Sequence, residues 1–173
     1  MLIVVKNEEM MESFTTDISH IIISIRSPKT ETVSIPYNES NAGVLFTCFH
    51  DLDHMPKSEH VCLGSIKPYV LFDEEMAKEI LCFVKLHENE IDLIVVNCEA
   101  GISRSAGVAA ALSKILNDED EYFFKEYLPN MLVYRIMLET AQDTSYFGAD
   151  KKHSASEASK RVLPPPSIED IFQ

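Results

Sequence analysis

A short glycine-containing loop between two apolar segments restricts the fold of this chain more than any other feature. The segment before it, residues 91–96, has the composition of a buried strand, and the segment after it, residues 106–112, has that of a helix. Within the loop, Cys98 and Arg104 lie six positions apart around Gly101. The chain is therefore predicted to be an α/β protein in which this loop joins a strand to the N-terminus of a helix.

The loop has the chemistry of an oxyanion site. Backbone N–H groups in the first turn of a helix lack intrahelical partners, and the helix dipole places partial positive charge at the same point. A ring of such donors would bind a dianionic phosphoryl group. The donors and the guanidinium of Arg104 would also favour the thiolate of Cys98, which is its reactive form. The loop thus combines a phosphate site with a nucleophile.

Three other properties of the loop suit this chemistry. Arg104 carries a planar, permanent charge that holds two phosphoryl oxygens better than a lysine would. Gly101 permits a backbone torsion or a close approach that a Cβ atom would obstruct. The hydroxyl of Ser105 can hydrogen-bond the sulfur of Cys98 and help it leave when water cleaves a phosphocysteine intermediate.

Chance is the competing interpretation of this spacing. A cysteine six residues before an arginine is common, and most single cysteines are small core residues. The central glycine, the Arg-Ser pair, the preceding apolar strand and the following small-residue helix all favour an oxyanion cradle instead.

With these residues the chain resembles the protein tyrosine phosphatase superfamily, whose motif is His-Cys, five residues, then Arg followed by Ser or Thr. The match is closest to the small, dual-specificity-like branch; it is sharpest over residues 95–111 and weaker over residues 21–141. The resemblance implies a central, mostly parallel sheet flanked by helices, with Cys98 as nucleophile and Ser105 aiding departure of the thiolate. It also implies that Arg104 binds phosphate and that the amide ring is formed by Glu99, Ala100, Gly101, Ile102, Ser103 and Arg104.

Asn97 departs from the family motif, which has a histidine before the nucleophile. In the family, that histidine supports the loop and helps keep the cysteine ionised. An asparagine side chain can hydrogen-bond to backbone, but it carries no charge at any pH. We therefore interpret Asn97 as a partial structural replacement, and we expect Cys98 to ionise less readily than in the family, with lower activity.

The family's reaction also requires an acid that protonates the leaving oxygen, and the resemblance implies an aspartate on a loop upstream of the cysteine. Here the apolar segment 44–49 has strand character and ends just before Asp51. Asp51 is our first choice for the acid because it matches the family's strand-then-aspartate arrangement, and Asp53 is the second. The separation from Cys98 is longer than in compact relatives, by roughly the segment 55–69.

Two other interpretations of this acidic segment stay open. An Asp-x-Asp sequence between two histidines is also typical of a solvated turn. The segment and one later histidine also supply residue types that bind metals: His50, Asp51, Asp53, His54 and His60. A thiolate-based phosphatase has no chemical need of a metal, so the sequence predicts neither a metal site nor a cofactor.

Hydrophobic patterns and helix signals predict the remaining elements. Strands are predicted at residues 1–5, 19–25, 32–35 and 44–49, besides the strand before Cys98. Helices are predicted at residues 7–14, from 73 onward, and at 106–117, 122–128 and 131–142. Asp73 is a suitable N-cap, and the acidic run 118–121 suits the start of the following helix. This order predicts parallel strands with right-handed crossovers and a site at their carboxyl ends.

The cysteines and the apolar patterns indicate a reduced compartment. The four cysteines lie at wide spacings, and the chain shows no apolar stretch long enough for a signal peptide or a membrane span, so we expect a cytoplasmic protein. Cys48 and Cys82 lie within apolar patterns and are predicted to be core residues. The alternative is that one of them forms a protective disulfide with Cys98 under oxidation.

Length and composition predict one domain. A chain of 173 residues with 46% hydrophobic residues can bury a proper core, and we assign residues 1–145 to a single phosphatase-like catalytic domain. Residues 146–173 are polar and contain three consecutive prolines, which predicts a flexible C-terminal tail. Its last apolar residues either dock on a surface or fray.

The formal net charge of −13 limits the partners. Nucleic acids and anionic membranes need clustered lysines and arginines, so neither is expected as a partner. We expect a phosphorylated protein or a small phosphomonoester as substrate, and long-range steering favours basic substrates over acidic ones. The sequence does not indicate the oligomeric state.

These features predict a cysteine-dependent phosphomonoester hydrolase that forms a phosphocysteine intermediate. Phosphotyrosine is the leading substrate. The depth of the site would distinguish it from other substrates, but sequence does not reveal that depth. The alternative substrates are therefore phosphoserine, phosphothreonine, phosphorylated small molecules and RNA 5′ ends. Two alternatives remain. One is a weak or inactive phosphatase-like module that binds phosphorylated partners, and the other is sulfur or arsenate chemistry on a similar loop.

Overall fold

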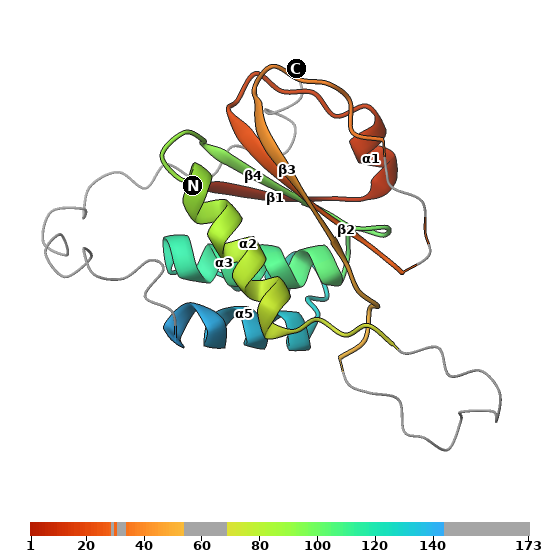
Figure 1. The fold of residues 1–173 in the computed structure, drawn as a ribbon, viewed down its shortest axis with the longest axis vertical. Helices are drawn as coiled ribbons and strands as arrows, with labels where there is room; N and C mark the ends of the chain where they lie inside the picture. Colours follow the sequence, from red (N-terminus) through yellow and green to blue (C-terminus); the bar gives the residue numbers. More distant parts are fainter. Residues whose placement is uncertain (29, 31–33, 54–68, 144–173) are drawn as a thin grey trace, which may run out of the picture.

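A computed structural model describes residues 1–28, 30, 34–53 and 69–143 of the chain (Figure 1). The tail predicted at residues 146–173 lies outside the described residues, as do Cys62, His54 and His60. The strand predicted at residues 32–35 is partly outside them too, and its described residues, Ser34 and Ile35, are not in a strand.

The described strands form a parallel four-stranded sheet in the order β1-β4-β2-β3. The strands are β1 (Leu2–Lys6), β2 (His20–Arg26), β3 (Asn41–Cys48) and β4 (Leu93–Asn97). β4 and β2 form the centre of the sheet, and their isoleucine and valine runs are buried on both faces, as expected of central parallel strands. The predicted α/β class, with a parallel sheet, is confirmed.

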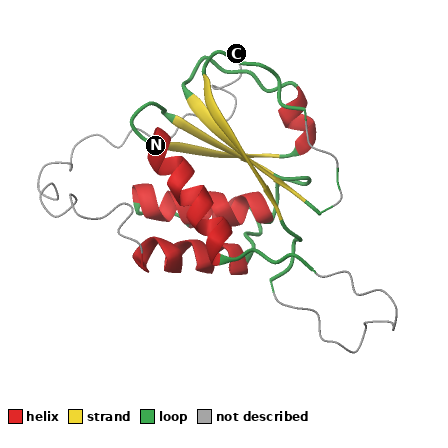
Figure 2. Cartoon of the chain, viewed as in Figure 1, coloured by secondary structure: helices red, strands yellow, loops and turns green. Residues whose placement is uncertain are grey.

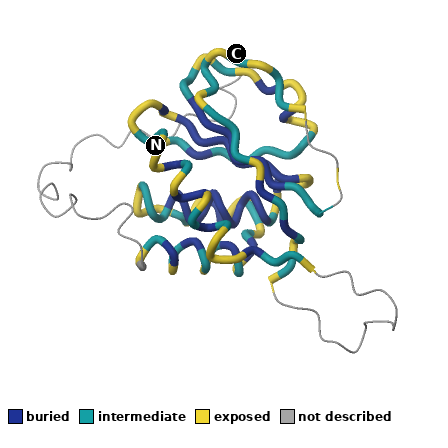
Figure 3. Tube along the Cα trace, in the orientation of Figure 1, coloured by how far each residue is buried: buried dark blue, intermediate teal, exposed yellow. Residues whose placement is uncertain are grey.

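Helices cover both faces of this sheet unequally (Figures 1 and 2). One face is covered by α2 (Glu74–His87) and α3 (Arg104–Asn117), and α5 (Met131–Asp143) packs against these two helices. The larger core lies on this side, where residues such as Ile23, Ile94 and Leu112 are fully buried. The opposite face is covered by α1 (Glu8–Glu12) and the segment after it, over a smaller core that contains Met11 and Phe14. Figure 3 shows the buried layer between sheet and helices.

α2 begins as the sequence predicts. The carboxylate of Asp73 accepts a 3.0 Å hydrogen bond from the backbone N–H of Met76, which is the geometry of an N-cap. The buried face of the helix contains Ala77, Ile80, Leu81 and Val84. Cys82 lies outside that face and is exposed, so its predicted place in the core was wrong, and Cys48 is only half-buried. Consecutive residues of a helix point about 100° apart around its axis, so Cys82 lies off the buried face although it follows the buried Leu81. An apolar stretch of sequence does not by itself show which of its residues face the core.

The α3–α5 connection contains a short helix, α4 (Glu121–Glu126), close to the range predicted for it. α3 ends at Asp118, which has a left-handed φ of 60°, and Asp120 is the N-cap residue of α4. The Asp120 side chain does not cap the helix; it accepts a hydrogen bond from the hydroxyl of Tyr134 on α5 instead. The short helix is thereby joined to α5.

The parallel arrangement brings the segments after β2, β3 and β4 to one edge of the sheet. Ser27 follows β2, Asp51 follows β3, and Cys98 follows β4. Within the described part of the chain, no helix has both the length and the apolar character needed to cross a membrane.

Candidate active site

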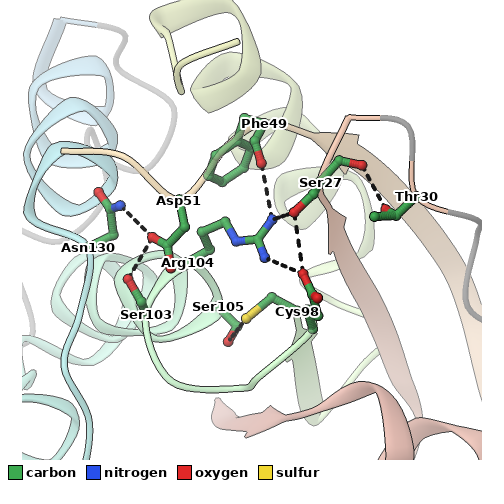
Figure 4. Close-up of polar contacts among 10 residues, drawn as sticks. Ser27, Thr30, Phe49, Asp51, Cys98, Ser103, Arg104, Ser105 and Asn130 are labelled. Carbon is green, nitrogen blue, oxygen red and sulfur yellow. Dashed lines mark hydrogen bonds and ion pairs between the residues drawn. The ribbon is translucent and has the colours of Figure 1, made fainter. Parts of the chain in front are cut away.

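Residues 98–103, here called the Cys98 loop, connect β4 to α3 and curve around the side chains of Cys98 and Ser105 at the carboxyl edge of the sheet (Figure 4). Gly101 has a left-handed φ of 67°. A Cβ atom at this position would lie 2.9 Å from the backbone nitrogen of Asn7 and 3.0 Å from the carbonyl oxygen of Lys6. Both the torsion and the close approach therefore require glycine here.

Neighbouring segments hold the carbonyl groups of the Cys98 loop. The Glu99 carbonyl accepts from the N–H of Glu8 at 3.4 Å, the Ile102 carbonyl from that of Leu128 at 3.2 Å, and the Ser103 carbonyl from that of Asn130 at 3.1 Å. Because the C=O and N–H of a trans peptide unit point in opposite directions, these bonds turn the next N–H groups away from the supporting segments.

The N–H groups of the Cys98 loop are unengaged. Among the described residues, none of the backbone N–H groups of residues 99–104 donates a hydrogen bond. Buried peptide donors without partners are rare in proteins, and Gly101 and Arg104 are buried. Donors of this kind at the N-terminus of α3 are suited to bind an anion.

Cys98 lies within the curve of the loop. Its side chain is 2% exposed, and its sulfur lies 3.0 Å from the hydroxyl oxygen of Ser105 on the first turn of α3. Figure 4 shows the two side chains next to each other, facing the side on which the Arg104 guanidinium lies. The hydroxyl can donate to a thiolate, which is the form that a nucleophile requires.

Arg104 is 4% exposed, and its guanidinium is held in one orientation. Nη1 donates to the hydroxyl of Ser27 at 2.9 Å and to the carbonyl oxygen of Phe49 at 3.1 Å. Nη2 lies 3.4 Å from a carboxylate oxygen of Glu99. Nε is buried and has no hydrogen-bond partner among the described residues. One edge of the guanidinium, Nε and Nη2, is thus the edge on which an oxyanion can bind in a bidentate manner.

Asp51 lies beside the same loop, just after β3. Its Oδ1 accepts a 2.7 Å hydrogen bond from the hydroxyl of Ser103 and a 2.9 Å hydrogen bond from the side-chain amide of Asn130. Asp51 is exposed, so its other carboxyl oxygen is accessible. Asp53 is exposed as well, and it is Asp51 whose carboxylate is bound to the Cys98 loop through Ser103. The geometry therefore favours Asp51 of the two aspartates.

Asn97 does not make the interaction expected of it. Its side chain is completely buried at the end of β4, and neither Oδ1 nor Nδ2 has a hydrogen-bond partner among the described residues. The backbone hydrogen bond that an asparagine can make at this position is therefore not formed with any described residue. A buried amide without partners costs on the order of 1–3 kcal/mol.

The possible metal cluster around Asp51 is not assembled in the described residues. His50 Nδ1 accepts a 3.0 Å hydrogen bond from the N–H of Val70, so this side chain is engaged by backbone. No group of three histidine, cysteine, aspartate or glutamate side chains suited to a metal ion occurs in the described part of the chain.

Sequence reasoning missed two side chains that organise the site. Asn130 caps α5, accepting from the N–H groups of Leu132 and Val133, and it holds Asp51 with its amide nitrogen. Its place after a proline and before an amphipathic helix is the signal that indicates an N-cap. Ser27 holds Arg104, and the available signal was its position directly after a strand that ends at the same edge as Cys98.

Neither the known protein-family models nor the curated protein sequences contain a match to the chain. Solved structures do match. PTPMT1 in complex with PI(5)P superimposes with a TM-score of 0.51 at 12% identity, covering 82% of this chain and 91% of that one. The human tyrosine phosphatase-like serine/threonine/tyrosine-interacting protein gives a TM-score of 0.50 at 16% identity, with the same two coverages. The chain therefore has the fold of the protein tyrosine and dual-specificity phosphatases, in agreement with the resemblance found in its sequence.

Proposed function

We propose that this protein hydrolyses phosphomonoesters through a phosphocysteine intermediate, with protein phosphotyrosine as the leading substrate and phosphoserine or phosphothreonine as further ones. The observation that carries the proposal is the position of the Cys98 sulfur, 3.0 Å from Ser105 inside a loop whose N–H groups have no described partner. Arg104 adds a buried, oriented cation at the same place. A nucleophile and an anion site in one loop suit phosphoryl transfer.

In the first step, the thiolate of Cys98 attacks phosphorus in line and the bond from phosphorus to the leaving oxygen breaks. The N–H groups of the loop and the Nε–Nη2 edge of Arg104 hold the three other phosphoryl oxygens. Asp51, in its protonated form, donates its proton to the leaving oxygen. Its tie to Ser103 keeps the carboxyl next to the loop.

In the second step, water attacks the phosphocysteine and the sulfur–phosphorus bond breaks. Asp51, now a carboxylate, accepts a proton from the water. The hydroxyl of Ser105 donates a hydrogen bond to the departing thiolate of Cys98, a role consistent with the 3.0 Å separation of the two atoms. Inorganic phosphate is released and the enzyme returns to its starting state.

One observation favours a second function, that of a phosphate-binding module with weak turnover. The amide of Asn97 makes no described hydrogen bond behind the nucleophile, at the position where the family has a supporting histidine. A less supported loop would bind phosphate yet hold its nucleophile poorly. Binding of phosphorylated partners without turnover is the expected behaviour of such a module.

The experiment that tests the proposal is hydrolysis of an aryl phosphate by the wild type and by Cys98→Ser and Asp51→Asn, with vanadate as competitor. We expect turnover in the wild type, inhibition by vanadate, and loss of turnover with retained phosphate binding in Cys98→Ser. Phosphate binding without turnover in the wild type identifies the binding module. Wild-type turnover that persists in Cys98→Ser contradicts the proposed mechanism.

A comparison of substrates separates the finer possibilities. Phosphotyrosine, phosphoserine and phosphothreonine peptides form one set, and a soluble phosphoinositide forms the other, because PTPMT1 was solved with PI(5)P. The proposal expects the highest kcat/KM for phosphotyrosine peptides. A higher value for the phosphoinositide moves the substrate class to small phosphomonoesters and leaves the thiolate chemistry intact.

A further inference from the structure

The three hydrogen bonds of Arg104 divide its guanidinium into two parts. Nη1 is fully used by Ser27 and Phe49, which fix its orientation. Nε has no partner among the described residues, and Nη2 is engaged only by the carboxylate of Glu99. The edge that would bind two phosphoryl oxygens is therefore half free and half covered by an acidic side chain of the same loop.

Glu99 is held over this edge by two contacts. Its Oε2 lies 3.4 Å from Nη2 of Arg104 and accepts from the hydroxyl of Ser27 at 3.4 Å. Its side chain is 58% exposed, whereas that of Arg104 is 5% exposed. Both contacts are long, and solvent screens the carboxylate, so an incoming dianion can displace it.

We propose that Glu99 is a specificity-determining residue that competes with the phosphoryl group for Arg104 and selects substrates in which a cationic group lies next to the phosphate. The inference rests on the proposed function and adds the substrate class. A phosphoryl group that takes Nη2 removes the cationic partner of the Glu99 carboxylate and leaves it only the Ser27 hydroxyl. The carboxylate then lies at the mouth of the site beside a dianion, which is unfavourable unless a positive charge of the substrate replaces Arg104.

The backbone and the side chain of Glu99 thus have opposite effects on phosphate binding. Its N–H belongs to the ring that binds the phosphoryl group, and its carboxylate opposes binding of any phosphate that lacks a neighbouring cation. Substitution by glutamine keeps the backbone and the approximate shape and removes only the charge. Glu99→Gln therefore isolates the proposed effect.

The protein's net charge of −13 requires a matched control, because removal of any acidic group favours anion binding to some extent. Glu119 is exposed and lies just past the far end of α3. Since α3 begins at Arg104 and a 14-residue helix is about 20 Å long, Glu119 lies well outside the Debye length of the site. Glu119→Gln makes the same change of net charge away from the loop.

The first experiment measures equilibrium binding of inorganic phosphate by calorimetry to wild type, Glu99→Gln and Glu119→Gln. We expect Glu99→Gln to bind roughly three- to tenfold more tightly and Glu119→Gln to bind as the wild type does. Equal or weaker binding by Glu99→Gln overturns the proposal. The readout does not depend on turnover, so it stays decisive if the protein proves to be a binding module.

The second experiment measures binding of phosphotyrosine peptides with lysine or aspartate beside the phosphorylated residue, in a Cys98→Ser background. We expect the lysine peptide to be preferred, and Glu99→Gln to reduce that preference about fivefold while Glu119→Gln leaves it unchanged. If Glu99→Gln still prefers the lysine peptide as strongly as the wild type does, the protein's net charge alone explains the preference. That result overturns the proposal that Glu99 selects substrates with a cationic group next to the phosphate. Absence of phosphate binding by all variants instead contradicts the proposed function.

Discussion

The hydroxyl of Ser103 donates a 2.7 Å hydrogen bond to Oδ1 of Asp51, and this bond joins the segment after β3 to the Cys98 loop. Asn130, at the start of α5, donates to the same oxygen at 2.9 Å. Both donors use Oδ1, so Oδ2 remains available to carry the proton that the proposed reaction needs. Three segments far apart in sequence thereby position one carboxyl group.

Ser103→Ala should therefore impair acid catalysis more than phosphate binding. We expect kcat for an alkyl phosphate to fall about fivefold, corresponding to about 1 kcal/mol for one hydrogen bond, with little change for an activated aryl phosphate. Asp51→Asn should show the same pattern with a loss of roughly a hundredfold or more. Steady-state kinetics with a series of leaving groups measures both effects.

The exposed Ser13 supplies the control, because Ser13→Ala removes a hydroxyl that lies at the end of α1. It should leave kcat unchanged for every leaving group. Equal losses for activated and poor leaving groups in Ser103→Ala would contradict a positioning role toward Asp51.

Asn97→His should raise the nucleophilicity of Cys98. The asparagine amide makes no described hydrogen bond, whereas a protonated imidazole near the thiol favours the thiolate. We expect alkylation of Cys98 to reach its midpoint at a lower pH than in the wild type, and kcat to rise. Site-resolved mass spectrometry must be used, because Cys82 is exposed and reacts with the same reagent. If the midpoint pH of Cys98 alkylation is the same in Asn97→His and the wild type, the expectation that Asn97 supports the thiolate less well than a histidine is wrong.

Gly101→Ala tests the backbone geometry of the loop. Alanine at a φ of 67° costs on the order of 1–3 kcal/mol, and its Cβ would meet backbone atoms of Lys6 and Asn7 that cannot move aside. We expect a lower free energy of unfolding in urea titrations and loss of phosphate binding. Gly43→Ala is the control, because Gly43 has no positive φ and its contacts, at 3.2 Å, are to the ends of two side chains.

Much of this fold could be predicted from local sequence patterns, because its central elements are locally consistent. The isoleucine and valine runs of β2 and β4 are suited to buried strands, and Asp73 carries the N-cap signal that α2 uses. The strand-loop-helix order around Cys98 then determined which edge of the sheet carries the loop.

The partners of Arg104 and Asp51 could not be predicted, because they depend on how distant segments meet. The carbonyl oxygen of Phe49 has no side-chain signal, and Ser27 lies 77 positions from Arg104 in the sequence. The lack of partners around Asn97 is likewise a property of its packed surroundings and not of its residue type. The sequence therefore indicates which groups are proposed to react, but it does not indicate which residues orient them.

The hydroxyl of Tyr134 donates a hydrogen bond to Asp120, and this contact predicts a dependence of stability on pH. Burial, together with that hydrogen bond, raises the pKa of Tyr134 to about 12, from the 10.0 of a free phenol. The folded state thus favours the neutral phenol. This contribution to stability is complete below pH 10, where the phenol is neutral in both states, and it is lost as pH rises toward 12.

Tyr134→Phe should lower the free energy of unfolding by about 1 kcal/mol at pH 8, because it removes the hydrogen bond to the Asp120 carboxylate. The difference from the wild type should stay constant up to pH 10 and shrink between pH 10 and 12. Urea titrations at several pH values measure it, and Tyr37→Phe is the control because Tyr37 is 90% exposed. A difference that grows with pH would mean that the phenolate is the favoured form. Leu128 and Asn130, in the segment between α4 and α5, hydrogen-bond to the Cys98 loop, so the same loss of stability should reduce phosphate affinity at high pH.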